Sequence, residues 1–234
     1  GAPRGATPSP WSAGSCGYKG QAGKQRLAGL LKFGEAAETP KDRVDRMLAA
    51  GGTADVDALI EVRDLMEAMA ELELQGRVCR AIVAKKKAAH GEGSREYGTA
   101  LNELATLLSR DMRKYDEALP LYKQYIEVTK KVHGREDHPD VAIGLNNLAL
   151  LLMDQGHYDE AKPLLEQALE IWKKALGNDH PSVAIGLHNL AALLLKLGNM
   201  QEAARLGKQA LTILEKAPGP HPPNPQQPTK AWGA

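Results

Sequence analysis

Histidines are the first residues of this sequence whose side chains could do chemistry, because a neutral imidazole binds metals and exchanges protons near neutral pH. Four of the seven, His133, His138, His157 and His180, lie in turns or at the ends of expected helices. His138 and His180 occupy the same place in two similar segments, each directly before a proline. No cysteine or further histidine stands beside them at the spacing of a zinc motif. We therefore expect these histidines to cap helices or to form hydrogen bonds in loops, and we expect no metal site.

A second candidate is the glycine-containing segment at residues 20–25, which has some of the features of a phosphate-binding loop. The spacing of such a loop would place its first glycine at Tyr18, and Gln25 stands where serine or threonine is needed. The segment is therefore not a phosphate loop. The sequence also lacks a nucleophile elbow and a paired-carboxylate motif. We expect no cofactor, no catalytic residue and no enzymatic activity.

The elements that position these residues follow a repeated pattern. A five-residue pattern that begins at Leu101 recurs 44 residues later at Leu145 and 42 residues after that at Leu187. A second pattern, Tyr-Asp-Glu-Ala, begins at Tyr115 and at Tyr158 and is weaker in the third copy. A period of this size is typical of stacked repeats, each of which buries its apolar face against its neighbours.

Each copy is expected to form a hairpin of two helices, called helix A and helix B below. In the second copy, Pro139 opens helix A, Gly156 makes the turn and helix B begins at Tyr158. Ile143 and several leucines recur at helical spacing and are expected to bury one face of helix A. In the first copy, Ser94 caps helix A, and one additional residue is expected to lengthen the turn before helix B.

Further helices are expected before the repeats. Thr39 caps a first helix, and a longer helix over residues 56–74 is followed by a break at Gly76 and a helix over 77–89. Residues 56–91 therefore resemble a worn repeat whose second helix is shortened. The expected organisation is an arm at 1–38, N-terminal helices at 39–93, repeats at 94–136, 137–178 and 179–217, and a tail at 218–234.

The two ends differ in composition. Residues 1–38 are rich in Gly, Pro and Ser and carry five basic but no acidic residues through Gly34, which is typical of a disordered arm or of the remnant of an organellar transit sequence. Residues 218–234 contain six prolines and are expected to be extended. Trp232 would then be an anchor for a partner, or a stray aromatic residue in a loose tail. We expect both ends to lie on a partner.

Two details of the repeats carry a family resemblance. Asp137-His138-Pro139 and Asp179-His180-Pro181 open helix A in the second and third copies, and Tyr-Asp-Glu-Ala opens helix B. This combination resembles the tetratricopeptide repeat, and the 42-residue form with Asp-His-Pro is similar to the kinesin light chain variety. The resemblance implies an all-α fold, a right-handed α-α superhelix. No heptad coiled coil like the one that joins light chains to kinesin heavy chains is present, so a motor subunit is not expected.

The resemblance also implies a partner-binding site on the concave face, which helices A line in this family. Inward asparagines there bind the backbone of an extended peptide, since one amide group both donates and accepts hydrogen bonds. The alternative is that the asparagines bond only to neighbouring repeats, and that the groove is empty or filled by the chain's own tail. The expected partner-binding residues are Asn102, Asn146, Asn147, Leu150, Met153, His188, Asn189, Leu195 and Trp232.

Composition limits the class of partner. The chain has 30 basic and 29 acidic residues, so no net field favours nucleic acid or an anionic membrane. No apolar run approaches the ~20 residues of a membrane span. Cys16 and Cys79 lie far apart in the sequence and in unlike contexts, which indicates a reducing compartment and not a disulfide. This compartment could be the cytoplasm or an organelle (plastid or mitochondrion).

Two functions fit these observations. In the first, the chain is a non-catalytic scaffold, a structural or accessory subunit of a large assembly, which it contacts through its arm, its concave face and its tail; an organelle is one location open to this assembly. In the second, it is a peptide-binding adaptor that recruits a client protein through the concave groove alone. Both have protein partners and neither needs a cofactor.

Overall fold

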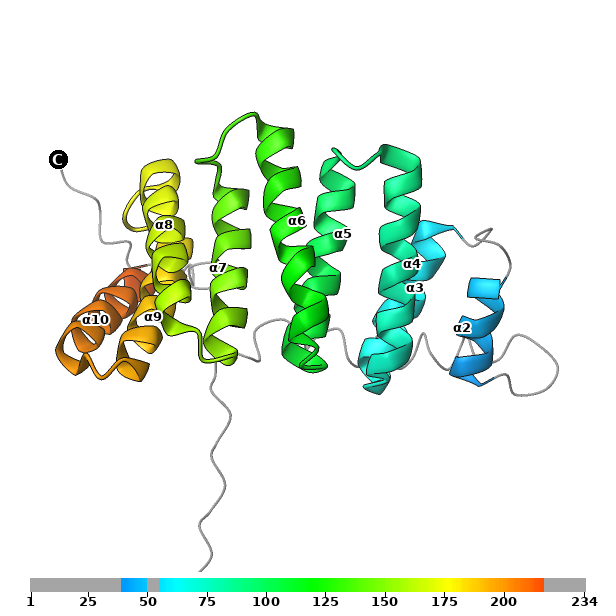
Figure 1. Cartoon of the computed structure of the whole chain (residues 1–234), viewed down its shortest axis with the longest axis horizontal. Coiled ribbons are helices and arrows are strands. Elements are labelled where there is room, and N and C mark those ends of the chain that lie inside the picture. Colours follow the sequence, from blue (N-terminus) through cyan, green and yellow to red (C-terminus); the bar gives the residue numbers. More distant parts are fainter. Residues whose placement is uncertain (1–38, 50–54, 217–234) are drawn as a thin grey trace, which may run out of the picture. The chain divides into compact units, whose positions relative to one another are not determined.

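The computed structural model describes residues 39–49 and 55–216, and every regular element in these residues is helical (Figure 1). The expected all-α fold is therefore confirmed. The arm at 1–38 and the tail beyond residue 217 lie outside the described residues. Within the described residues, no helix has the length and apolar character needed to cross a membrane. The elements are α2 (Pro40–Ala49), α3 (Val56–Met69), α4 (Leu72–His90), α5 (Arg95–Thr106), the π-helical segment η1 (Leu107–Asp111), α6 (Tyr115–His133), α7 (Pro139–Asp154), α8 (Tyr158–Leu176), α9 (Pro181–Lys196) and α10 (Met200–Lys216).

The chain divides into two compact units, Gly1–Arg113 and Lys114–Ala234, and the division falls between helix A and helix B of the first expected repeat. In the first unit, α4 packs against α2, α3 and α5. As expected, Thr39 caps α2, because its hydroxyl oxygen accepts a hydrogen bond of 3.1 Å from the backbone N–H of Asp42. The core of this unit consists of Val44, Leu59, Val62, Met66, Val78, Ile82 and Ala100.

The break between α3 and α4 lies at Ala70 and not at Gly76, so the expected helix boundaries were wrong here. Ala70 adopts the left-handed conformation, with a φ of 59°, and its N–H donates to the carbonyl oxygen of Glu67. Gly76 instead lies inside α4, where a Cβ would lie 3.4 Å from Sδ of Met112. With 19 residues, α4 is as long as α6 and α8, so the second helix of this pair is not shortened; α3, with 14 residues, is the shorter partner.

The additional residue of the first repeat lies in the helix and not in the turn. Helix A continues from α5 into η1, where the N–H of Met112 donates to the carbonyl oxygen of Leu107 five residues earlier, as in a π-helix. The turn that follows has three residues, as in the other repeats. Its middle residue, Arg113, has a φ of 53°, whereas Gly156 and Gly198 occupy the same place with φ values of 82° and 80°. The expectation of a longer turn was therefore wrong.

In the second unit, α7 pairs with α8 and α9 pairs with α10, while α6 packs against α7 and α8 packs against α9 (Figure 1). These contacts depend on a glycine in each helix A. A Cβ at Gly144 would lie 2.6 Å from Cγ1 of Ile126, and one at Gly186 would lie 3.2 Å from the side chains of Leu169 and Trp172. The absence of a side chain therefore lets each helix A approach the preceding helix B closely.

Histidine caps begin both helices A of this unit. Nδ1 of His138 accepts a hydrogen bond of 3.1 Å from the N–H of Asp140, and Nδ1 of His180 accepts one of 3.1 Å from the N–H of Ser182. A proline follows each cap in the first turn, where its missing N–H costs nothing. The expectation that these two histidines cap helices is confirmed.

Candidate partner-binding site

Helices α7 and α9 lie side by side in the second unit, and each exposes apolar side chains. Ile143 and Ile185, which are equivalent residues of the two repeats, are both exposed, Ile185 by 51%. Leu195 is exposed by 58%. Because about half of each side chain is already covered, a partner that buries the rest gains roughly half of the about 1.5–3 kcal/mol that full burial provides. We call this surface the helix A face; its residues are Ile143, Asn147, Leu150, Ile185, Asn189 and Leu195.

A hydrogen bond between asparagines joins the two repeats at this face. Nδ2 of Asn189 donates to Oδ1 of Asn146 over 2.8 Å, and Asn146 is only 6% exposed. Asn146 therefore belongs to the seam between α7 and α9, because its carbonyl oxygen already has a partner and solvent hardly reaches it. The sequence left open an alternative in which the asparagines bond only to neighbouring repeats, and this hydrogen bond is of that kind.

The other expected site residues are distributed over both units. Asn147, Leu150 and Met153 are half-buried on α7, and His188 is exposed on α9. Asn102 is half-buried on α5 of the first unit. The adjacent Glu103, which departs from the asparagine pattern, accepts a 2.6 Å hydrogen bond from Arg63. Trp232 lies outside the described residues.

Ile143 and Ile185 are the members of the face that sequence analysis missed. Ile143 was expected to be buried among the leucines of helix A. A signal was present, because Asn147 and Leu150 follow Ile143 by four and seven residues and so lie on the same side of the helix. A helix that is apolar nearly all round does not show which of its sides stays uncovered.

A second surface depression in this unit, of about 550 Å³, lies between α8, α9 and α10 and differs in character. Charged side chains line its rim and form ion pairs with one another; Arg205, for example, donates to Glu202 over 2.9 Å. The leucines that α9 contributes to its floor, such as Leu187 and Leu190, are themselves buried. A partner would therefore find fewer exposed apolar anchors here than on the helix A face.

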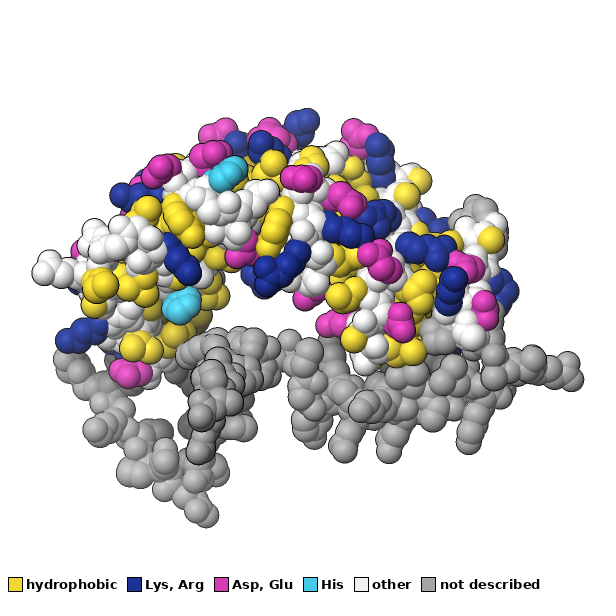
Figure 2. All heavy atoms as spheres, turned by 60° about the horizontal axis from the view of Figure 1, so that its bottom comes forward, with side chains coloured by type: hydrophobic (Ala, Val, Ile, Leu, Met, Phe, Trp, Pro, Cys, Tyr) yellow, Lys and Arg dark blue, Asp and Glu magenta, His cyan; other side chains and the backbone are white. Residues whose placement is uncertain are grey.

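On the side of the molecule that Figure 2 shows, the charges have no dominant sign. Lysine and arginine side chains alternate with aspartate and glutamate on the side shown in Figure 2, and hydrophobic side chains are visible between them. A partner recognised here would be selected by apolar contacts and hydrogen bonds and not by one large electrostatic field.

The buried thiol of the first unit is not an activated nucleophile. Burial in α4 raises the pKa of Cys79 to about 11, so the group is a neutral thiol at physiological pH. A catalytic cysteine needs the opposite shift, toward a thiolate. Cys79 is therefore a packing residue.

The structure brings together one group of potential metal ligands that sequence analysis did not foresee. His133, His138 and Asp140 offer ligand atoms within 4.8 Å of one another. A signal was present, because four residues separate His133 from His138, a spacing found in the histidine pair of zinc fingers, but no cysteine pair accompanies them and Asp140 belongs to no such motif.

Comparison with known proteins identifies the repeat. Two tetratricopeptide repeat models match, one over residues 98–140 and one over 140–216, and together they span about half of the chain. The chain belongs to the tetratricopeptide repeat family. As the sequence predicted, the solved structures that share its fold include a putative kinesin light chain. Membership of this family supports a role as a scaffold or adaptor in protein–protein interaction. No curated protein matches the sequence.

Solved structures share the fold of this tetratricopeptide repeat protein at low sequence identity. BtubC (BKLC) from P. vanneervenii is 22% identical with a TM-score of 0.63, over 92% of this chain and 82% of that one. A putative kinesin light chain from Podosopora anserina, with nearly identical repeats, is 22% identical with a TM-score of 0.60, over 85% and 94%. A Rap protein complexed with Competence and Sporulation Factor is 13% identical with a TM-score of 0.59, over 85% and 52%.

Proposed function

We propose that this tetratricopeptide repeat protein is a non-catalytic scaffold that binds a segment of a partner protein along the helix A face. The observation that carries the proposal is the pair of exposed isoleucines, Ile143 and Ile185, at equivalent places on adjacent helices, with Leu195 beyond them. Exposed apolar side chains grouped in this way mark a surface that a partner covers.

The polar groups of the face suit a protein segment. Asn147 and Asn189 are half-buried between the apolar residues, and an asparagine amide can both donate to and accept from a peptide backbone. One such hydrogen bond contributes only about 0.5–1.5 kcal/mol, so most of the affinity must come from covering Ile185, Leu195 and their neighbours. A fold neighbour of this chain, the Rap protein named above, is itself complexed with a factor.

The proposal includes contacts from the two ends of the chain. The basic arm at 1–38 and the proline-rich tail at 218–234 would extend the contact with a larger assembly, for which an organelle is one candidate location, and Trp232 would anchor the tail. In the adaptor alternative, the helix A face alone holds the client. The ends therefore separate the two forms of the proposal.

The test replaces apolar residues of the face. Partners are isolated with the full chain from the native extract, identified by mass spectrometry, and their affinity is measured for the variant Ile185→Ser with Leu195→Ser. Each of the two side chains is only about half exposed, so their loss should weaken binding by about tenfold to a hundredfold. Leu211→Ser is the matched control, because Leu211 is 57% exposed, like Leu195, but belongs to α10 and not to a helix of the face.

Unchanged binding by the double variant would refute the role of the helix A face. If the double variant does bind more weakly, deletion of 1–38 and 218–234 distinguishes the scaffold form of the proposal from the adaptor form. A scaffold subunit should lose its association with the assembly, whereas an adaptor should keep its client.

A further inference from the structure

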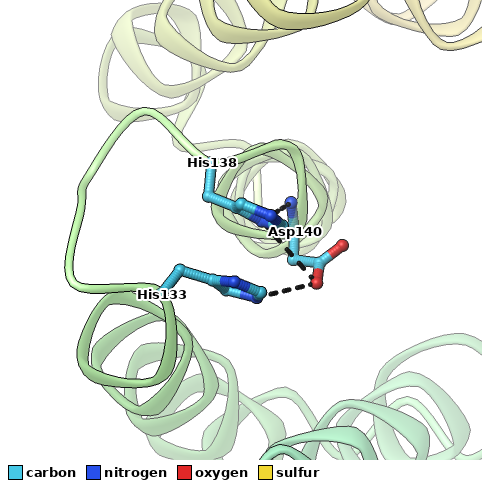
Figure 3. A group of neighbouring side chains, drawn as sticks. All are labelled: His133, His138 and Asp140. Atoms are coloured by element: carbon cyan, nitrogen blue, oxygen red, sulfur yellow. Dashed lines mark hydrogen bonds and ion pairs between the residues drawn. The ribbon is translucent and has the colours of Figure 1, made fainter.

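His133, His138 and Asp140 meet where α6 ends and α7 begins (Figure 3). Nε2 of His133 lies 3.0 Å from Oδ2 of Asp140, and Nδ1 of His138 lies 3.7 Å from the same oxygen. The two imidazole rings are stacked, with centroids 3.3 Å apart and planes within 7°. Two imidazole nitrogens and one carboxylate oxygen, all atoms that can bind a metal, thus lie close together at the surface.

The spacing of these atoms fits a small divalent ion. Metal–ligand bonds of about 2.0–2.1 Å place neighbouring ligands of a tetrahedral zinc ion about 3.3 Å apart. The two distances to Oδ2 of Asp140, 3.0 and 3.7 Å, lie on either side of that value. At the contact between His133 and Asp140, a bound metal ion would replace the proton that joins the two side chains.

The surroundings hold Asp140 in place and leave the group accessible. The backbone of Asp140 is bonded on both sides, since its N–H donates to His138 and its carbonyl oxygen accepts a 3.2 Å hydrogen bond from the hydroxyl of Tyr125. The side chains of His133, His138 and Asp140 are 18%, 26% and 25% exposed, so a hydrated ion can reach them and keep a water ligand. The basic neighbours have acidic partners: Lys130 lies by Glu127 and Glu136, and Arg135 lies by Asp137.

We propose that His133, His138 and Asp140 form a binding site for a divalent transition metal ion of the zinc class. Two imidazoles and one carboxylate suit Zn²⁺, Cu²⁺ and Ni²⁺ better than Mg²⁺ or Ca²⁺, which prefer sites made of oxygen ligands. Three protein ligands leave a fourth position open to water.

Binding requires one ring to turn. Two parallel rings 3.3 Å apart cannot both direct an in-plane nitrogen lone pair at one ion. Nδ1 of His138 also accepts the N–H of Asp140, so His138 either gives up this cap or turns to offer Nε2. The imidazole resonances of His133 and His138 should therefore shift more on metal binding than those of the other histidines.

The third repeat supplies an internal control. Leu176 and Ser182 stand there in place of His133 and Asp140, while His180 caps the helix as His138 does. The substitutions His133→Leu and Asp140→Ser each remove one ligand. Each also introduces the residue type that stands at the equivalent position of the third repeat.

The experiment titrates the untagged full chain with Zn²⁺ by calorimetry and with Co²⁺ by visible absorption. We expect one saturable site that weakens by at least about tenfold in His133→Leu and in Asp140→Ser. His157→Ala removes an exposed imidazole near Glu160 and should bind as the wild type does. Circular dichroism verifies that each variant is folded. The proposal is overturned if the wild type shows no saturable binding, or if both ligand variants bind as tightly as the wild type.

Discussion

The close approach of helix A to the preceding helix B can be tested with three glycine-to-alanine variants of the second unit. Gly144, Gly186 and Gly207 all lie inside helices, in α7, α9 and α10. A Cβ at Gly207 would meet nothing within 4 Å, and at Gly186 it would meet Leu169 and Trp172 at 3.2 Å. At Gly144 it would lie 2.6 Å from Ile126, a distance that cannot persist without movement.

The magnitudes follow from two opposing effects. Alanine favours a helix interior over glycine by about 0.8–1.0 kcal/mol, and Gly207→Ala should show this gain alone. Overpacking of a buried contact costs about 1–3 kcal/mol. Gly144→Ala should therefore destabilise the unit by up to about 2 kcal/mol, because the buried Ile126 and Tyr125 must both move. Gly186→Ala should fall between the two variants, near zero, since its contacts need to relax by only a few tenths of an ångström.

The assay is urea unfolding of the full chain followed by circular dichroism, with thermal unfolding as a second measurement. Each kcal/mol should move the melting temperature by about 2–4 °C in a domain of this size. The expected order of stability is Gly207→Ala, then Gly186→Ala, then Gly144→Ala. If Gly144→Ala were as stable as Gly207→Ala, the close packing of α7 against α6 would be refuted.

Two further predictions concern buried polar groups. Burial raises the pKa of Cys79 from 9.0 to about 11, so Cys79, followed separately from Cys16 by peptide mass spectrometry, should resist iodoacetamide at about pH 8 in the folded chain and react only after unfolding. In the unfolded chain this thiol ionises first, so stability should fall as pH rises from about 9 to about 11, and less so in Cys79→Ala; an equal fall in both would contradict the assignment. Asn189→Ala leaves the buried Oδ1 of Asn146 without its donor and should cost about 1–3 kcal/mol. Combination with Asn146→Ala in a double-mutant cycle should give a coupling energy of about 0.5–1.5 kcal/mol, and strictly additive effects would show that the bond is absent.

Helix starts and the glycine turns of the second and third repeats were predictable because local chemistry determines them, whereas the turn of the first repeat was predicted one residue too long. Ser94 accepts the N–H of Tyr97, and Gly156 has the positive φ that a glycine turn needs. The end of α3 was not predictable, because nothing in alanine favours the left-handed conformation that Ala70 adopts. Gly76, the residue that pointed to a break, fits within a packed helix instead.

The site was predictable only in outline. The repeat pattern placed the asparagines on helix A, yet it could not show that Asn146 is covered while Ile143 is exposed, because both depend on how α9 lies against α7. Likewise, whether His133 reaches His138 depends on the path of the loop between them, which neither residue determines.

The π-helical segment η1 has a consequence for how such repeats change length during evolution. An inserted codon in an α-helix would rotate every later side chain by about 100° and turn its buried face to solvent. In η1 the added residue widens one turn only, so Leu107, Leu108 and Ser109 all stay buried and the three-residue turn before Tyr115 is kept. A single-residue insertion can thus be held inside a repeat while the next helix begins in the same place. It accounts for one of the two residues by which the spacing grows from 42 to 44, and the longer connection between α6 and α7 accounts for the other.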